Sequence, residues 1–293
     1  MESSQLSALS RLFSSAVVRE LAVKGQSSTF ARLAHELGSS SFATANPKVA
    51  DVYDSFFTML KRKGRRDEYI YKTALTHRIL LGRHSLRTAC MLSEFRAGDC
   101  KADIAILNGT TTVYEVKSER DSLTRLERQI GSYRKVFASV FVIAGENHVA
   151  TILKSTPSDV GVLKLDSRGY ISTSRESVDL PGRICPATVF DALRTNEAKS
   201  ILTETGIAVP DVPNTRLREE LRHRFEKLRP EIVHQGMLRT LKKTRNMQPL
   251  ADLVSKLPSS LQAAALSVRL RKADHERLVN AVNTPLHLAL TWA

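Results

Sequence analysis

The feature that most constrains the fold is the run of residues 103–133, which predicts strand, turn, strand and helix in that order. The first strand opens with an acid, Asp103, ahead of a short apolar run, and Asn108-Gly109 favours a tight hairpin turn. Residues 110–117 are rich in Thr, Val and Tyr, which favour strands. A polar break then precedes a helical pattern. This order predicts an α/β fold built on a hairpin.

Charged side chains interrupt these apolar strands. Asp103 begins one strand, and Glu115 and Lys117 end the next, where alternation places both on one face. A charge in a central strand is costly to bury unless it is paired or binds an ion. A three-residue loop sets Leu107 opposite Thr111 and brings Asp103 beside Glu115. A two-residue loop would turn Glu115 to the other face.

Two neighbouring carboxylates repel each other, and a divalent cation relieves the repulsion. Hard oxygen ligands suit Mg²⁺ or Mn²⁺. Lys117 shares a face with Glu115 and could orient a water and stabilise phosphoryl charge. The pattern therefore predicts a metal site at Asp103 and Glu115 that serves hydrolysis of a phosphodiester.

Asp103, eleven intervening residues and Glu115-Val116-Lys117 together resemble the motif of the PD-(D/E)xK nuclease superfamily. Gln129 and Tyr133 follow on the next helix. They are four residues apart, share a helix face, and resemble the Q-x-x-x-Y motif of RecB-type nucleases.

The longer run YEVKSERDSLTRLERQIGSYRKVF also resembles a family of small bacterial and phage proteins of the PD-(D/E)xK type. The resemblance implies a restriction-endonuclease-like mixed sheet flanked by helices, with helical N- and C-terminal extensions. It implies catalytic roles for Asp103, Glu115 and Lys117, and a Mg²⁺ or Mn²⁺ cofactor. Gln129 and Tyr133 would position substrate or water.

In the PD-(D/E)xK fold a helix precedes the first core strand and often carries a third acid. Glu68 starts a helix expected over residues 67–81, although a carboxylate is also favoured at a helix N-terminus for its own sake. Glu94, near the end of a strand expected at 86–95, is the rival. Both stay candidates for the metal.

A second Glu-x-Lys, Glu197-Ala-Lys199, serves as a control. It lies in a helix-like stretch, and its nearest upstream acid, Asp191, is too close to lie across a hairpin. The pattern by itself is therefore weak, and the hairpin around Asp103 distinguishes the first copy.

The formal net charge of +14 predicts attraction to polyanions, of which nucleic acid is the commonest. One basic run precedes the expected nuclease core and would contact phosphate or form a solvated loop: Lys61, Arg62, Lys63, Arg65 and Arg66.

The chain of 293 residues is long enough for two domains or for one with extensions. We expect a helical N-terminal extension at 1–64, a nuclease-like core at 65–180 and a basic helical domain at 181–293. Three widely spaced cysteines argue against a disulfide scaffold or zinc ribbon. The sequence shows no signal peptide and no apolar run of about 18 residues, so we expect a cytoplasmic protein that does not enter a membrane.

These features together predict a Mg²⁺-dependent nuclease, a phosphodiester hydrolase acting on DNA. The alternative is a catalytically inactive protein with a nuclease fold that binds nucleic acid or acts in assembly. The motif does not separate DNA from RNA.

Overall fold

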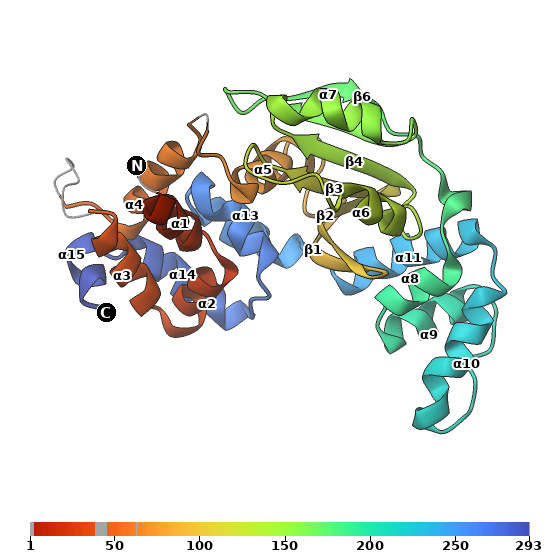
Figure 1. Ribbon diagram of the computed structural model, residues 1–293. Helices are drawn as coiled ribbons and strands as arrows, with labels where there is room; N and C mark the ends of the chain where they lie inside the picture. Colours follow the sequence, from red (N-terminus) through yellow and green to blue (C-terminus); the bar gives the residue numbers. More distant parts are fainter. Residues whose placement is uncertain (1–2, 39–45, 63, 293) are drawn as a thin grey trace. The chain divides into compact units, whose positions relative to one another are not determined.

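The computed structural model describes residues 3–38, 46–62 and 64–292, which form two compact units (Figure 1). The first comprises the described residues of Met1–His77, Ser167–Gly169 and Pro249–Ala293; the second comprises Arg78–Asp166 and Tyr170–Gln248. The sequence predicted three segments with boundaries after residues 64 and 180. The structure divides 181–293 instead, and its last helices share a unit with the N-terminal helices.

The first unit is helical. Ser14 and Ser27 accept hydrogen bonds from the backbone N–H of Val17 and Phe30 and so begin the second and third helices. The helices of this unit are α1 (Ser3–Leu12), α2 (Ser15–Lys24), α3 (Ser28–Glu36), α4 (Val49–Leu60), α5 (Glu68–Leu75), α12 (Ala251–Lys256), α13 (Ser259–Ser267), α14 (Lys272–Asn283) and α15 (Leu286–Ala289).

The second unit holds a six-stranded mixed sheet with flanking helices. Its strands are β1 (Cys90–Ala97), β2 (Cys100–Asn108), β3 (Thr110–Lys117), β4 (Ser139–Ala144), β5 (Gly161–Leu165) and β6 (Ile171–Arg175). Its α-helices are α6 (Leu126–Tyr133), α7 (Glu146–Ser155), α8 (Pro186–Ala192), α9 (Thr195–Glu204), α10 (Asn214–Glu226) and α11 (Pro230–Thr244). The coarse prediction of an α/β fold with a mixed sheet is confirmed.

The strands lie in the order in which they occur in the chain, from β1 to β6. The pairs β1–β2, β2–β3 and β5–β6 are antiparallel, whereas β3–β4 and β4–β5 are parallel. Parallel neighbours need a crossover, and α6 and α7 provide the two crossovers. The hairpin of β2 and β3 therefore lies inside the sheet, between β1 and β4. Helix α6 connects β3 to β4, its parallel neighbour.

The register of this hairpin is the predicted one. Leu107 pairs with Thr111, and Gly109 between the strands has φ of 74°. A positive φ is easily adopted by glycine, which has no Cβ. Since a slip of one residue would reverse every side chain, the turn determines which residues of β3 meet those of β2.

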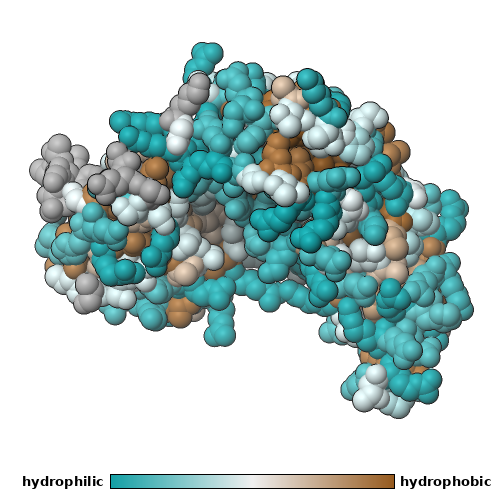
Figure 2. All heavy atoms as spheres, in the orientation of Figure 1, coloured by the Kyte–Doolittle hydropathy of each residue, from teal (hydrophilic) through white to brown (hydrophobic). Residues whose placement is uncertain are grey.

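One hydrophobic core joins the sheet to its helices. Ala105 and Val113 of the central strands belong to the same buried cluster as Leu126 and Ile130 of α6 and Phe225 of α10. Helix α6 contacts β2, α8 contacts β1, and α11 contacts β2 and β3. The outer surface around α10 is covered by hydrophilic side chains (Figure 2). The core therefore fixes α6 against the strands that carry the predicted site.

Candidate functional site

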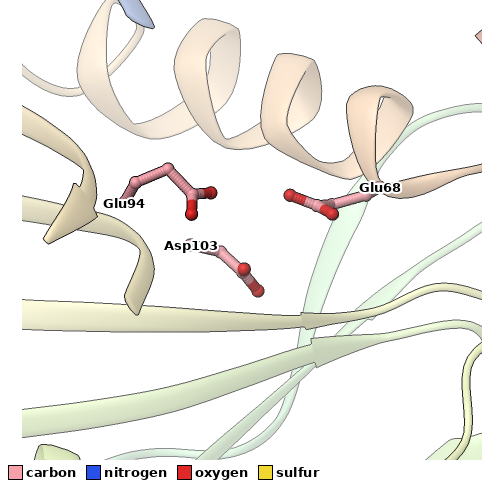
Figure 3. Close-up of side chains that lie close together, drawn as sticks. All are labelled: Glu68, Glu94 and Asp103. Atoms are coloured by element: carbon pink, nitrogen blue, oxygen red, sulfur yellow. The ribbon is translucent and has the colours of Figure 1, made fainter. Parts of the chain in front are cut away.

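Two acids stand opposite each other on β1 and β2. Ser93 pairs with Ile104, and Phe95 pairs with Ala102, so the register places Glu94 across from Asp103. Carboxylate oxygens of these two acids lie within 4.8 Å of each other (Figure 3). Glu94 is exposed and Asp103 is partly buried.

A backbone distortion accompanies this pair. Glu94 has φ of 52°, in the left-handed region that non-glycine residues seldom adopt. Leu92 and Phe95 both enter the core although they are three residues apart, and so do Ala102 and Ala105. Strict alternation would put residues three apart on opposite faces. Both strands therefore lose their alternation where the two acids occur.

The next acid in register is Glu115 on β3. Ile104 pairs with Tyr114, and one step further along the hairpin Asp103 comes beside Glu115. The backbone N–H of Val116 donates to Asp103 Oδ2 at 2.8 Å. Glu94, Asp103 and Glu115 thus occupy one level across three adjacent strands.

The four remaining motif residues form one hydrogen-bonded set. Lys117 Nζ lies 2.8 Å from Glu115 Oε1 and donates to Gln129 Oε1 at 2.9 Å. The hydroxyl of Tyr133 lies 2.6 Å from Glu115 Oε2 and 2.8 Å from the carbonyl oxygen of Lys101. The structure therefore brings Gln129 and Tyr133 of α6 onto the Glu-x-Lys of β3.

This set is buried. Glu115 is 1% exposed and Lys117 is 5% exposed. Burial, followed by the neighbouring carboxylate of Glu115, raises the pKa of Tyr133 well above its usual range. Tyr133 therefore stays protonated, and its hydroxyl donates to Glu115 and cannot serve as a base. Each charge in the pair has a partner, as burial requires.

The acids fit a divalent cation by their chemistry. Two carboxylates within 4.8 Å repel each other in the absence of a cation. A carboxylate offers about four acceptor sites, so the bonds from Lys117 and Tyr133 leave acceptor capacity at Glu115. Glu94, Asp103 and Glu115 are the residues of the second unit that would hold Mg²⁺ or Mn²⁺.

Glu68 lies in the first unit. It is in the first turn of α5, is exposed, and pairs with Lys72 one turn later. Asp67 begins the helix by accepting from the N–H of Ile70. The expected helix ends as a short π-helix, Thr76–Leu80. A metal-binding role for Glu68 (labelled in Figure 3) stays a prediction.

The basic run is not uniform. Lys61 and Arg62 are exposed, and Lys61 lies over the ring of Phe57 at 4.6 Å. Arg65 is partly exposed. Arg66 is only 3% exposed, which corrects its expected placement on a phosphate-binding surface. The predicted contact at residue 63, Lys63, lies outside the described residues.

The control copy of Glu-x-Lys is structural. Glu197 is 2% exposed, accepts from the backbone N–H of Arg194, and pairs with Arg245 at 2.9 Å. The acid therefore stabilises the start of α9 and ties it to the end of α11. The same three-residue pattern performs different tasks in a strand and in a helix.

Sequence reasoning did not foresee the backbone of Glu94 or the donor to Asp103. A left-handed residue inside a strand has no sequence signal unless it is a glycine. The N–H of Val116 carries no side-chain signature either. Both follow from how β1, β2 and β3 pair.

Comparison with known proteins places the chain in a family. The family model described as bacteriophage P4 protein cII matches residues 61–263, which is more than half of the chain. The protein therefore belongs to the phage P4 cII family. The match includes both central strands and α6.

A curated relative, protein cII of Enterobacteria phage P4, is 32% identical over 111 residues. The match covers 36% of this chain and 41% of the relative, so the chain spans about two fifths of the length of that relative. A solved structure of a protein of unknown function, SPO1766 from Silicibacter pomeroyi, is 18% identical and is covered over 80% of its length and 40% of this chain. Its TM-score is 0.28, which does not establish a common fold. Among the described residues, every helix is too short or too polar to cross a membrane.

Proposed function

We propose that the protein is a metal-dependent nuclease that hydrolyses phosphodiester bonds in DNA, on a restriction-endonuclease-like sheet. The observation that carries the proposal is the set of hydrogen bonds that joins Lys117 to both Glu115 and Gln129, and Glu115 to Tyr133. The predicted motif residues of β3 and α6 converge in this set, beside Asp103. An ordinary surface ion pair would not be buried in this way.

The residues have separate tasks in this proposal. Asp103 and Glu115, with Glu94 beside them, would hold Mg²⁺ or Mn²⁺, which would supply a Lewis acid toward a phosphate oxygen. Lys117 provides positive charge where negative charge develops on the phosphoryl group. Gln129 and Tyr133 position Lys117 and Glu115, so they would act through these two residues.

Substrate binding in this proposal relies on the basic surface. The net charge of +14 favours a polyanion, and Lys61 and Arg62 are exposed cations that can meet phosphate. Attraction to phosphates is not specific for sequence. The free cysteines Cys90, Cys100 and Cys185 support a reducing compartment, and we include the cytoplasm in the proposal.

The test is incubation of the full chain with plasmid DNA, single-stranded DNA and RNA in Mg²⁺, in Mn²⁺ and in EDTA. We expect cleavage of DNA that requires the metal and is abolished in Asp103→Asn. This variant keeps an oxygen that can accept from the N–H of Val116. Asp99→Asn, an exposed acid at the turn between β1 and β2, is the matched control and should cleave normally.

A second readout does not depend on cleavage. Millimolar Mg²⁺ should raise the melting temperature of the wild type and of Asp99→Asn but not of Asp103→Asn, because a ligand stabilises only a protein that binds it. DNA binding without cleavage under any metal would overturn the nuclease and support the alternative, an inactive protein with this fold. Cleavage by Asp103→Asn at the wild-type rate would overturn the site.

A further inference from the structure

A pocket of about 450 Å³ lies beside α6, away from the motif residues of that helix. One side is formed by α6 and Arg134, and the other by the end of α7 and Pro157. The volume falls in the range of small-molecule sites, roughly 300–1,000 Å³. The acidic site does not include it, because Gln129 and Tyr133 face the sheet through their hydrogen bonds to Lys117 and Glu115.

The charge around this pocket is positive. Arg134 and Lys154 line it, against one acid, Glu127. The carboxylate nearest to Arg134 is that of Asp159, which also pairs with Arg183. One carboxylate is thus shared by two guanidinium groups, and a cationic surplus remains for an anion.

Arg134 also has an unused donor. Its Nη2 lies 3.0 Å from Asp159, but its buried Nε–H has no hydrogen-bond partner among the described residues. A buried donor without a partner is costly, and such groups in folded proteins usually have a ligand or water as partner. The Arg134 side chain is 34% exposed, so a ligand in the pocket would meet its accessible terminal nitrogens, while the Nε–H stays inaccessible.

The end of α7 would normally oppose an anion, since its carbonyl groups carry partial negative charge. Arg175 offsets this charge. It donates to the carbonyl oxygens of Leu153 at 3.1 Å and Val160 at 2.7 Å, on either side of the pocket residue Thr156. Arg175 also donates to the carbonyl oxygen of the pocket residue Thr156 at 3.5 Å, so these carbonyl groups at the end of α7 already have a cationic partner.

The pocket is also open above the helix backbone. Gly131 lines it, and a Cβ added at Gly131 would meet no atom within 4 Å. Gly131 and Pro157 line the pocket with no charged group of their own, so an uncharged part of a ligand could lie against them. A lone phosphate would leave most of this volume unfilled.

We propose that this pocket binds a phosphorylated nucleoside, with its phosphate at Arg134 and Lys154 and its base over Gly131 and Pro157. Glu127 accepts hydrogen bonds from the base or sugar. The ligand is a free mononucleotide or a terminal nucleotide of a strand, which share this chemistry. The inference goes beyond the proposed nuclease, because binding here does not require Asp103.

Calorimetric titration of the full chain with adenosine 5′-monophosphate tests the proposal. We expect binding by the wild type and a loss of about tenfold or more in Gly131→Phe and Arg134→Gln, the scale of one charge-assisted hydrogen bond. Gly131→Phe fills the pocket and leaves the cations Arg134 and Lys154 in place. Asp159 keeps Arg183 as a partner in Arg134→Gln, and far-UV circular dichroism checks the fold.

The remaining arms separate the ligands and the two proposals. Adenosine should bind more weakly than the monophosphate, and inorganic phosphate should also bind more weakly. A 5′-phosphorylated oligonucleotide that binds more tightly than the mononucleotide, and loses affinity in Gly131→Phe, identifies the strand as the source. Asp103→Asn should bind the mononucleotide like the wild type, whatever it does to cleavage. No binding of either ligand, equal binding of phosphate, or wild-type affinity in Gly131→Phe would overturn the pocket.

Discussion

At the scale of single residues, the site depends on how a buried pair of charges is satisfied. Glu115 and Lys117 are both nearly inaccessible and lie 2.8 Å apart. Removing one partner of such a pair leaves an uncompensated charge, which costs about 3–5 kcal/mol, whereas replacing both is often neutral. Stability and catalysis can therefore be separated by substitution.

Glu115→Gln and Lys117→Met should each lower the free energy of unfolding, and the double variant should recover most of the loss. Cleavage should fall roughly a hundredfold or more in all three proteins, the scale for one lost electrostatic group. Urea denaturation and single-turnover cleavage measure the two effects. Lys199→Ala, in the other Glu-x-Lys, is the control and should change neither. A double variant that cleaves like the wild type would remove Lys117 from the reaction.

A second residue couples stability to pH. His234 of α11 is 1% exposed, its Nε2 lies 3.2 Å from Thr110 Oγ1, and its Nδ1 has no hydrogen-bond partner among the described residues. Burial lowers the pKa of His234, and the nearby carboxylate of Asp179 opposes the shift. The folded protein therefore takes up this proton at a lower pH than the unfolded chain does.

Stability should consequently fall as the pH drops below about 6.5, where the unfolded imidazole becomes protonated. Urea denaturation between pH 7.5 and about 5 should show this loss in the wild type and a smaller loss in His234→Gln. His223→Gln, an exposed histidine on α10, should follow the wild type. Identical pH slopes in all three proteins would contradict the role of His234.

At the scale of secondary structure, β1 contains one residue, Glu94, whose backbone conformation is unfavourable for any amino acid other than glycine. The φ of 52° at Glu94 is costly for any side chain with a Cβ, by roughly 1–2 kcal/mol. In an ordinary strand interior, glycine is less stable than alanine. At this position the order should reverse.

Glu94→Gly should therefore be more stable than Glu94→Ala by about 1 kcal/mol. Both variants lack the carboxylate, so both should show a smaller thermal stabilisation by Mg²⁺ than the wild type. Urea denaturation measures the first effect and melting with metal the second. At Ser93, an adjacent strand position without positive φ, alanine should be the more stable of the same two substitutions. If Glu94→Ala is also more stable than Glu94→Gly, the backbone of β1 is not strained at this position.

At the scale of the whole molecule, the excess of cations should govern affinity for nucleic acid. Many arginines of the second unit already have acidic partners, as Arg216 has Glu220 and Arg229 has Glu231. Among the described residues, Lys61, Arg62 and Arg65 form no ion pair with an acid, and Lys61 and Arg62 are exposed. Cations without acidic neighbours release more counterions when they meet phosphate.

Replacing Lys61, Arg62 and Arg65 together by Gln should weaken DNA binding and lower the salt slope by up to about 0.9 for each lost contact. Arg66 is left intact because it is buried. The charge-matched control replaces Arg216, Arg222 and Arg229, which all have acidic partners, and should change the slope less. Fluorescence anisotropy over a salt series measures both. An equal decrease of the salt slope in the two triple variants would contradict a special role of the basic run in DNA binding.

The sequence by itself determined the central hairpin and most of the site. Three features of this region are local in the sequence: the Asn-Gly turn, the two-residue period of the strands and the four-residue spacing on α6. Local features can be predicted from neighbouring residues alone. The sequence left two loop lengths open, and the register of Leu107 with Thr111 is the one that the predicted site required. The spacing of Gln129 and Tyr133 likewise allowed both to meet β3.

Only the tertiary structure decided the rest, because it depends on contacts between distant segments. Glu94 lies opposite Asp103 because β1 pairs with β2. Its left-handed backbone conformation cannot be predicted from a glutamate in the sequence. Arg66 is buried although its neighbours in the same basic run are exposed. The helices after Pro249 share a unit with the N-terminal helices because apolar faces bury against whichever faces match them, irrespective of distance along the chain.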